Sequence, residues 1–191
     1  MDAYQILVGV GSIYVAPANT PKPDLAAEPG SEWVYLGETE DGVTATKSQS
    51  IAEHKSDQRT GPIKATRTDE SMTIATKLVA ATLENLSVAI GGATVNDNPP
   101  QTGVIGTRNM GLYLGGEVKE FAILFRGSSP YGDYPGQFYV PRGYFGGEVG
   151  LEFKKDKETV IPVEFHALED LNVADPTMRF GVVEYQDAPA Q

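Results

Sequence analysis

Three glutamates in the second half of the sequence come nearest to a catalytic arrangement. Glu148, Glu152 and Glu164 could supply the two carboxylates, about 5–10 Å apart, that glycoside hydrolysis requires. However, alternation of apolar and polar residues predicts strands over residues 145–154 and 160–168 with these glutamates on the solvent side. The aromatic residues, which would share the carboxylate face in a sugar site, point the other way. We therefore expect a solvated acidic face, with His166 as a surface histidine, and no catalytic residue.

Other patterns that carry chemistry are incomplete. The chain has no cysteine and two histidines, which excludes thiol chemistry and argues against most zinc sites. Residues 96–98 (NDN) and 170–175 (DLNVAD) lack the alternating oxygen ligands of a calcium loop, so they are predicted to be Asx turns. The segment VGVGSIY is neither a nucleophile elbow nor a phosphate-binding loop. The sequence predicts a protein that is not an enzyme and has no metal and no cofactor.

Composition favours a loop-rich β protein. The 191 residues are 40% apolar and include 21 glycines and 13 prolines. A net charge of −11 argues against tight binding to nucleic acid phosphates. No apolar run is long enough to cross a bilayer, so no membrane partner is expected. Residues 6–18 could pass for a signal peptide, but the segment before them has no basic residue and the alternation of Ile6, Val8 and Val10 favours a strand pair.

Periodicity predicts about ten strands, one helix and no parallel crossover units. The expected fold is a single domain over residues 1–191, mainly β, an antiparallel two-sheet β-sandwich or barrel with one α-helix. Strands are expected at 63–68 and 71–76, joined around Asp69-Glu70, and further strands at 112–114, 118–126 and 180–185. The predicted core comprises Phe121, Ile123, Phe125, Val149, Leu151, Phe153, Val163, Phe165, Leu83 and Leu86.

The one convincing helix is predicted within residues 77–92. Val79, Leu83, Leu86 and Ile90 form an apolar stripe with helical spacing, Thr76 is the expected N-cap, and Gly91-Gly92 is the expected stop. Glu84, Asn85 and Ser87 are expected to face solvent.

Residues 41–62 (DGVTATKSQSIAEHKSDQRTGP) are too polar to pack in a core of their own. Only Val43, Ala45, Ile51 and Ala52 are apolar. We expect a polar strand over 42–52 and a long charged loop at 53–62 that is mobile until a partner orders it. A flexible C-terminal tail is expected at 186–191.

Short motifs within residues 31–92 resemble the tail tube proteins of long-tailed bacteriophages. They are an aromatic-to-Leu-Gly turn at Trp33–Gly37, a DGV strand opening at 41–43, the Asp57-Gln58 pair with Pro62, and Thr-Leu-Glu-Asn-Leu at 82–86 before two glycines. The second half of the chain matches this family in architecture and acidic bias.

The resemblance implies a non-enzymatic subunit of the virion tail, assembled in the host cytoplasm. Such subunits form hexameric rings that stack into a tube through which DNA passes without specific binding during ejection. It implies contacts with further copies and with tape-measure, terminator and distal tail proteins. The residues expected to face the lumen are Thr44, Thr46, Ser48, Glu148, Glu152 and Glu164, and those expected in a ring-stacking loop are Glu53, Lys55, Asp57, Gln58 and Arg59.

Three other interpretations remain open at this point. The same architecture serves the tubes of contractile secretion systems and of phage-derived particles. A capsid or baseplate component is a second possibility. A carbohydrate-binding β-sandwich module is a third, which glycan binding would favour and ring formation would oppose.

Overall fold

The computed structural model describes residues 11–156 and 158–189. These residues form ten strands and one α-helix, and the strand expected over residues 6–10 lies outside them. In chain order the elements are β1 (Ser12–Pro17), β2 (Val34–Tyr35), β3 (Thr39–His54), β4 (Lys64–Leu78), α1 (Leu83–Ala89), β5 (Val95–Asn98), β6 (Thr107–Met110), β7 (Phe121–Ser128), β8 (Pro135–Gly146), β9 (Ile161–Ala167) and β10 (Val182–Tyr185).

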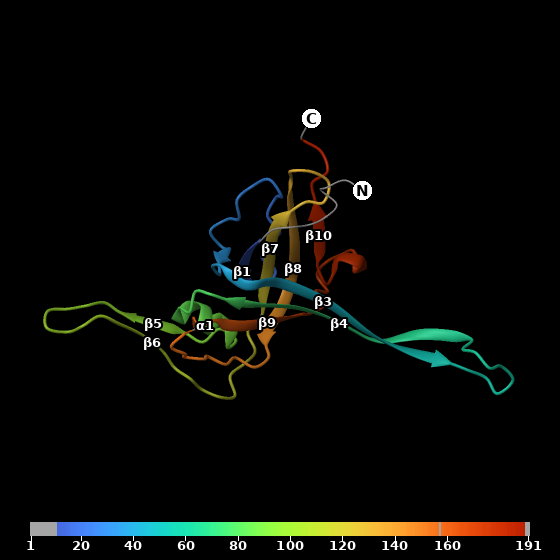
Figure 1. Ribbon diagram of the computed structural model, residues 1–191, viewed down its shortest axis with the longest axis horizontal. Helices are drawn as coiled ribbons and strands as arrows, with labels where there is room; N and C mark the ends of the chain where they lie inside the picture. Colours follow the sequence, from blue (N-terminus) through green and yellow to red (C-terminus); the bar gives the residue numbers. More distant parts are fainter. Residues whose placement is uncertain (1–10, 157, 190–191) are drawn as a thin grey trace.

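All strand pairs are antiparallel, and eight strands belong to one folded sheet. Its order is β2-β1-β7-β8-β9-β4-β3, with β10 beside β8, whereas β5 and β6 form a separate hairpin. Most of β8 pairs with β7 and β10, and its C-terminal end also pairs with β9. Strands β1, β7, β8 and β10 therefore form one layer. Strands β3, β4 and β9 form a second layer that crosses the first (Figure 1). The predicted mainly β, antiparallel sandwich with one helix is confirmed.

The bend between the layers depends on Gly143. This residue lies opposite Phe121 of β7 and Ala167 of β9. A Cβ atom at this position would lie 2.4 Å from the carbonyl oxygen of His166, closer than real Cβ contacts allow. Glycine thus lets β8 approach β9 where it leaves β7.

The main core lies between the two layers. Its buried members include Ile13 and Val15 of β1, Ile123 of β7, Val140 of β8, and Ile74, Leu78, Ile161, Val163 and Phe165 of the second layer. Of the predicted core residues, Ile123, Val163 and Phe165 are buried, and Phe121, Val149, Leu151 and Leu86 pack against the core from partly buried positions. Phe125 and Leu83 are half-buried. The placement of Phe153 was wrong: its side chain is 82% exposed, because β8 ends at Gly146 and Phe153 lies in the following loop.

The helix is shorter than predicted and buries a different face. Thr82, not Thr76, is the N-cap, and its hydroxyl accepts a hydrogen bond from the backbone N–H of Asn85 at 3.2 Å. Residues up to Leu78 instead continue β4, because Leu78 pairs with both Thr39 and Ile161. The predicted glycine stop is confirmed by left-handed backbone at Gly91 and Gly92.

Asn85 and Ser87, expected in solvent, are buried. The Asn85 amide donates hydrogen bonds to the backbone carbonyls of Leu36 at 2.9 Å and Ala80 at 2.8 Å. Ser87 donates to the carbonyl of Ala93. The helix therefore joins the sheet through a polar anchor as well as through Leu86 and Val88, which pack against the core.

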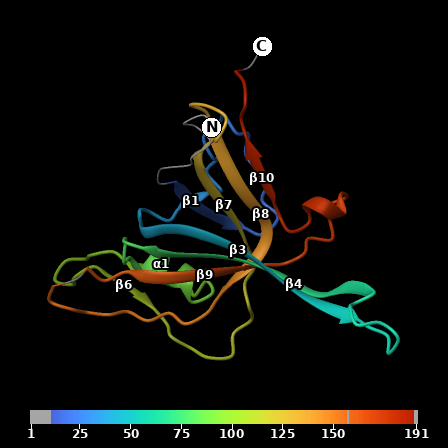
Figure 2. The same cartoon turned by 45° about the vertical axis from the view of Figure 1, so that its right-hand side comes forward.

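The polar segment forms one continuous two-stranded hairpin. The two strands expected at 63–68 and 71–76 are a single strand, β4, which pairs with β3 from Leu78 to Lys64. Asp69 and Glu70, expected in a turn, pair with Ser50 and Gln49, and the register shifts between Ser50 and Ile51. Because β9 pairs only with Thr73–Leu78, the outer part of the hairpin projects beyond the body of the molecule (Figures 1 and 2).

A second projection lies at the opposite end of the molecule. The β5–β6 hairpin extends there, and the segment at 111–120 leads back from it below α1 toward β7 (Figures 1 and 2). The Asx turn predicted at residues 96–98 is wrong, since these residues belong to β5. The strand predicted at 112–114 is wrong, since these residues form no strand pairing and their side chains are exposed.

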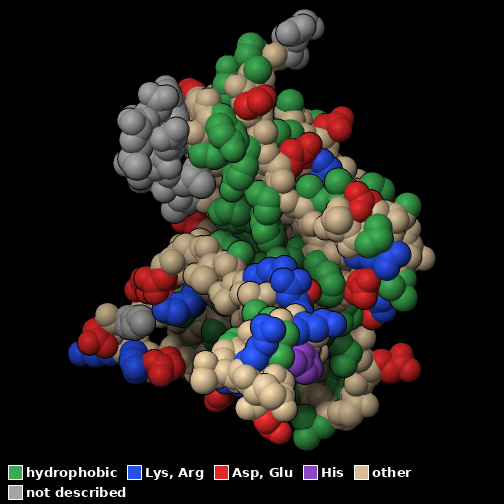
Figure 3. Space-filling model, turned by 90° about the vertical axis from the view of Figure 1, so that its right-hand side faces the viewer, with side chains coloured by type: hydrophobic (Ala, Val, Ile, Leu, Met, Phe, Trp, Pro, Cys, Tyr) green, Lys and Arg blue, Asp and Glu red, His purple; other side chains and the backbone are tan. Residues whose placement is uncertain are grey.

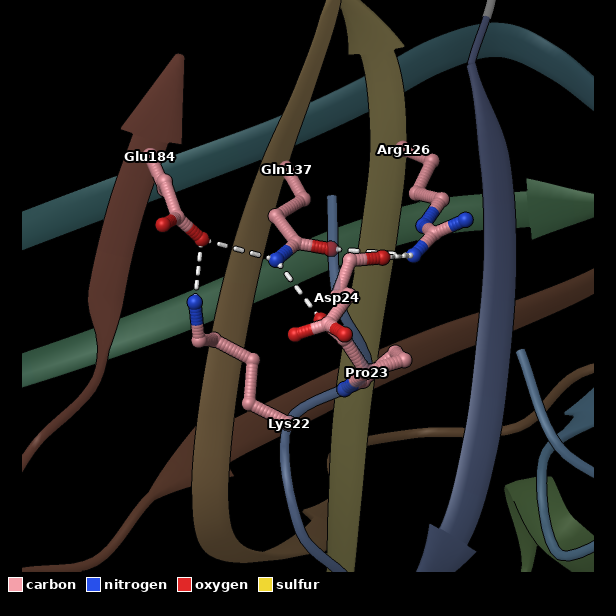
Figure 4. Close-up of polar contacts among 6 residues, drawn as sticks. All are labelled: Lys22, Pro23, Asp24, Arg126, Gln137 and Glu184. Atoms are coloured by element: carbon pink, nitrogen blue, oxygen red, sulfur yellow. Dashed lines mark hydrogen bonds and ion pairs between the residues drawn. The ribbon is translucent and has the colours of Figure 1, made fainter. Parts of the chain in front are cut away.

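A polar network fastens the loop between β1 and β2 to the first layer (Figure 4). Gln137, 2% exposed, donates from its side-chain amide to the carbonyl of Pro23 at 3.0 Å and to Glu184 at 2.9 Å. Lys22 forms an ion pair with Glu184, and Arg126 donates to the carbonyl of Asp24 at 2.6 Å. The network joins β7, β8 and β10 to a proline-rich loop that has little regular structure of its own.

The end of β10 is also fixed. The backbone N–H of Gln186 donates to the carbonyl of Pro135 at 3.1 Å, and Ser129 donates to the carbonyl of Gln186 at 2.6 Å. Flexibility of the tail beyond Gln186 stays a prediction.

Candidate functional site

The second layer turns one face toward the core and the other away from it. Ala45, Ile74, Phe165 and Phe145 lie opposite one another in neighbouring strands, and the last three are buried. The residues between them therefore lie on the opposite side of the sheet, which we call the outer face. Its cross-strand rows are Thr44–Ala75–Glu164–Gly146, Thr46–Thr73–His166–Tyr144 and Ser48–Ser71.

Hydroxyl groups and carboxylates dominate this outer face. Thr44, Thr46 and Ser48 are all exposed, as expected from the alternation of the polar strand. Thr44, Glu148 and Glu164 line one shallow depression, together with Glu40, Asp41 and Lys77. Four carboxylates and one ammonium group give this depression a net negative charge.

Lys77 is a member of this surface that the sequence reasoning missed. Its ammonium group lies 2.6 Å from a carboxylate oxygen of Asp41 and 3.8 Å from one of Glu40. The hydrogen bond with Asp41 is the main reason why the pKa of Lys77 is raised. Lys77 therefore remains charged but is held by acidic neighbours, which lowers its availability to a passing polyanion.

Glu148 and Glu152 reach this surface in a different way from the one predicted. The regular strand expected over 145–154 ends at Gly146, so these two glutamates lie in the loop between β8 and β9. Gly147, with φ of +92°, begins this loop. Glu148 lines the depression with Thr44, and Glu148 and Glu152 together line an adjoining one that also contains Lys154 and Glu158.

His166 lies on the outer face beside Glu164. Its ring stacks on Tyr144 with centroids 5.1 Å apart, and its Nε2 atom lies 3.4 Å from a Glu164 oxygen. Strand pairing brings Tyr144 and His166 together, a neighbour relation that the sequence alone does not reveal.

The hairpin of β3 and β4 presents an open edge. Among the described residues β3 pairs only with β4, so the other edge of this 16-residue strand has backbone donors and acceptors without strand partners. Such an edge is a template for pairing with another chain. Its length and polarity set it apart from β2, the two-residue strand at the opposite edge of the sheet.

The tip of the hairpin carries the residues predicted for a ring-stacking loop. Glu53 lies near the end of β3, whereas Lys55, Asp57, Gln58 and Arg59 lie in the loop at 55–63, and all five are exposed. The last strand pair is His54 with Lys64, where the Nε2 atom of His54 lies 2.8 Å from the hydroxyl of Thr66.

The projecting hairpin differs in charge from the body. Residues 47–70 contain five basic and four acidic side chains, a net charge of +1, so the remainder of the chain carries −12. Figure 3, which views the molecule from the side of the hairpin, shows basic side chains gathered in this region. The two parts are therefore electrostatically complementary.

The acidic segments considered as calcium loops have ordinary structural roles. Asp170 accepts a hydrogen bond from the backbone N–H of Asn172 at 3.0 Å, and Asp175 accepts one from Thr177 at 2.9 Å at the start of a 3-10 helix (Pro176–Met178). Residues 96–98 belong to β5. Among the described residues, no cluster of acidic and histidine side chains has the composition of a metal site, and no helix is long and apolar enough to span a membrane.

The described residues form an antiparallel β-sandwich with an open sheet edge and a projecting polar hairpin. The family model for phage tail tube proteins matches residues 1–183, and the chain belongs to this family. A comparison with curated proteins found no match. Membership of the family identifies a tail structural subunit that assembles with itself into a tube.

Proposed function

We propose that this protein forms hexameric rings that stack into the tail tube and conduct DNA during ejection. The single observation that carries the proposal is the open edge of β3, which is part of a hairpin extending beyond the subunit's own core. Because an exposed strand edge is a template for pairing, association of this strand with a neighbouring copy would continue the sheet from subunit to subunit.

In such a ring the outer face lines the channel. The lumen-facing residues are Thr44, Thr46, Ser48, Glu148, Glu152 and Glu164. Duplex DNA carries one negative charge per about 1.7 Å of its axis, so an acidic wall with hydroxyl groups does not retain it. The pairing of Lys77 with Asp41 and Glu40 supports the same role, since it neutralises a cation on this face.

The hairpin tip is the proposed contact between stacked rings, through Glu53, Lys55, Asp57, Gln58 and Arg59. The exposed, mixed charges of the tip, and the net charge of +1 over the whole projecting segment 47–70 against −12 for the rest of the chain, support contact with the acidic body of a copy in the adjacent ring. Tape-measure, terminator and distal tail proteins are the proposed partners inside and at the ends of the tube, which is assembled in the host cytoplasm and resides in the virion.

Shortening the hairpin tip tests this proposal. Replacing residues 55–63 by Asn-Gly joins His54 of β3 to Lys64 of β4 through a two-residue turn and removes no core side chain, since Ile63 is exposed. We expect an unchanged melting temperature, and electron microscopy should show stacked tubes for the natural protein but only single rings or free subunits for the variant. Tubes of normal length from the variant would refute the stacking role, and absence of rings from the natural protein at every concentration would refute the proposed function.

A further inference from the structure

The segment at 111–118, which we call the apolar arm, exposes an unusual number of large apolar side chains. Leu112 is 80% exposed, Leu114 is 100% exposed, and Tyr113 and Val118 are each 68% exposed. Val104 and Ile105 of the neighbouring hairpin loop are exposed as well. Contiguous exposed apolar groups of this kind mark a binding surface rather than a solvated loop.

An apolar groove lies on another part of the molecule. It has a volume of about 510 Å³, and its floor and walls include Met72 of β4, Phe138 of β8, Phe180 and Val183. Phe180 is 38% exposed and Val183 is 49% exposed, although Met72 and Phe138 contact the main core. The groove is thus a surface extension of the core that has room for further apolar side chains.

The arm of one molecule cannot fill the groove of the same molecule. The arm lines a cavity with Ile90 and Phe145, near the end of α1 and the C-terminal end of β8, whereas the groove lies beside β10 and Met72 of β4. An exposed apolar segment and an apolar groove on different parts of one chain allow a head-to-tail contact between copies. Repetition of such a contact closes a ring when the rotation between copies allows it.

Charges at the two surfaces are also complementary. Glu117 is the one carboxylate within residues 111–118, which contain no lysine, arginine or histidine. The rim of the groove carries Lys47 and Arg67, with Glu70 between them at 2.9 Å and 3.3 Å from their side-chain nitrogens. The rim therefore has a net positive charge of one, and it is able to receive the carboxylate of the arm.

We propose that the apolar arm of one copy packs into the apolar groove of the neighbouring copy, with Leu114 near Val183 and Glu117 near Lys47 and Arg67. The occupant is a second copy of this chain, and the contact rests on the proposed assembly into rings. It adds a side-chain interface to the strand pairing at β3, on residues that neither the lumen nor the hairpin tip uses.

Directed cross-linking tests this contact, since the chain has no natural cysteine to interfere. Leu114→Cys and Val183→Cys are prepared as separate proteins, mixed, assembled and treated with a short bismaleimide. We expect a covalent dimer containing one of each variant, because the two positions meet only between copies. Leu114→Cys mixed with Ser31→Cys, an exposed position in the loop before β2, is the matched control and should give no such dimer.

A pair of opposite charges introduced at positions 114 and 183 provides a second test, in which the concentration needed for assembly is measured. Leu114→Glu removes an exposed side chain, so the subunit should stay folded, but the concentration needed for assembly should rise about tenfold or more because the buried apolar contact is lost. Adding Val183→Lys in the same protein should restore much of the loss. This recovery of assembly is expected only if position 114 of one copy contacts position 183 of its neighbour.

The outcomes separate this inference from the proposed function. Rings that form without cross-linking between positions 114 and 183 would overturn the arm contact and leave the tube role standing. Unchanged assembly of Leu114→Glu would overturn it equally. Failure of the natural protein to form any ring would overturn both.

Discussion

At the scale of single residues, Glu184 joins β10 to the loop between β1 and β2. Its pKa is lowered mainly by the hydrogen-bonded ion pair with Lys22 and further by the amide of Gln137. A carboxyl group with a lowered pKa in the folded state stabilises the protein at pH values above its unfolded pKa, which lies near 4.5. This stabilisation is lost as the pH falls through the folded pKa.

Glu184→Gln should therefore lower the melting temperature at pH 7, and by a smaller amount as the pH falls below about 4.5 toward 3. The glutamine can still accept the hydrogen bond from Gln137, so the difference isolates the ion pair with Lys22. Thermal unfolding of both proteins across this pH range measures the effect. Because Glu184 is partly exposed, we expect a small shift, and a difference that grows toward pH 3 would contradict the assignment.

At the scale of elements, α1 is held by contacts that its own sequence does not specify. The helix has seven residues, too few to be stable alone, and Asn85 connects it to the carbonyl of Ala80 in the β4–α1 turn and to that of Leu36 in the segment between β2 and β3. Asn85 is 7% exposed, so these hydrogen bonds have no ready replacement by water.

Asn85→Ala should destabilise the protein by about 1–3 kcal/mol, because it leaves the buried carbonyl of Leu36 without this donor. Glu84→Gln, one residue earlier, is the matched control. Glu84 is exposed and forms a surface ion pair with Arg108, so its replacement should change the free energy of unfolding by less than about 1 kcal/mol. Equal effects in chemical denaturation would show that the Asn85 amide is not the anchor.

At the scale of the whole molecule, the acidic part of the outer face is formed by strand β9 together with the loop between β8 and β9. Glu164 belongs to β9, whereas Glu148 and Glu152 come from the loop after β8. In a closed ring this surface would be repeated in every copy. Electrostatic repulsion of DNA then acts over about 8 Å at physiological salt and over longer distances when salt is lower.

Glu148→Lys combined with Glu152→Lys should leave tube assembly largely intact and slow DNA ejection, most strongly at low ionic strength. The matched control is Glu28→Lys with Glu32→Lys, which makes the same change in charge at exposed positions of the β1–β2 loop. Ejection kinetics of virions carrying each pair measure the difference. Equal kinetics for the two pairs at low salt would place Glu148 and Glu152 outside the lumen.

Some properties of this protein follow from the sequence by itself. The alternation of Ile161, Val163 and Phe165 with polar neighbours determines that β9 has one buried face, and Gly91-Gly92 determines where the helix ends, since both signals are local. The ordered motifs of residues 31–92 also indicate the tail tube family, which the match over residues 1–183 confirms. The polar character of β3 likewise indicates a strand outside the core.

Other properties were decided only by the tertiary structure. Asp69 and Glu70 resemble a turn, but they remain in β4 because Ser50 and Gln49 pair with them and Lys47 and Arg67 hold the Glu70 carboxylate. The apparent strand at 145–154 ends at Gly146 because β8 has by then bent from β7 onto β9, and the residues that follow have no strand beside them. Asn85 is buried because the carbonyl of Leu36, 49 residues earlier, lies beside the helix. In each case the presence or absence of a partner distant in sequence decides the local structure, and no local pattern contains that information.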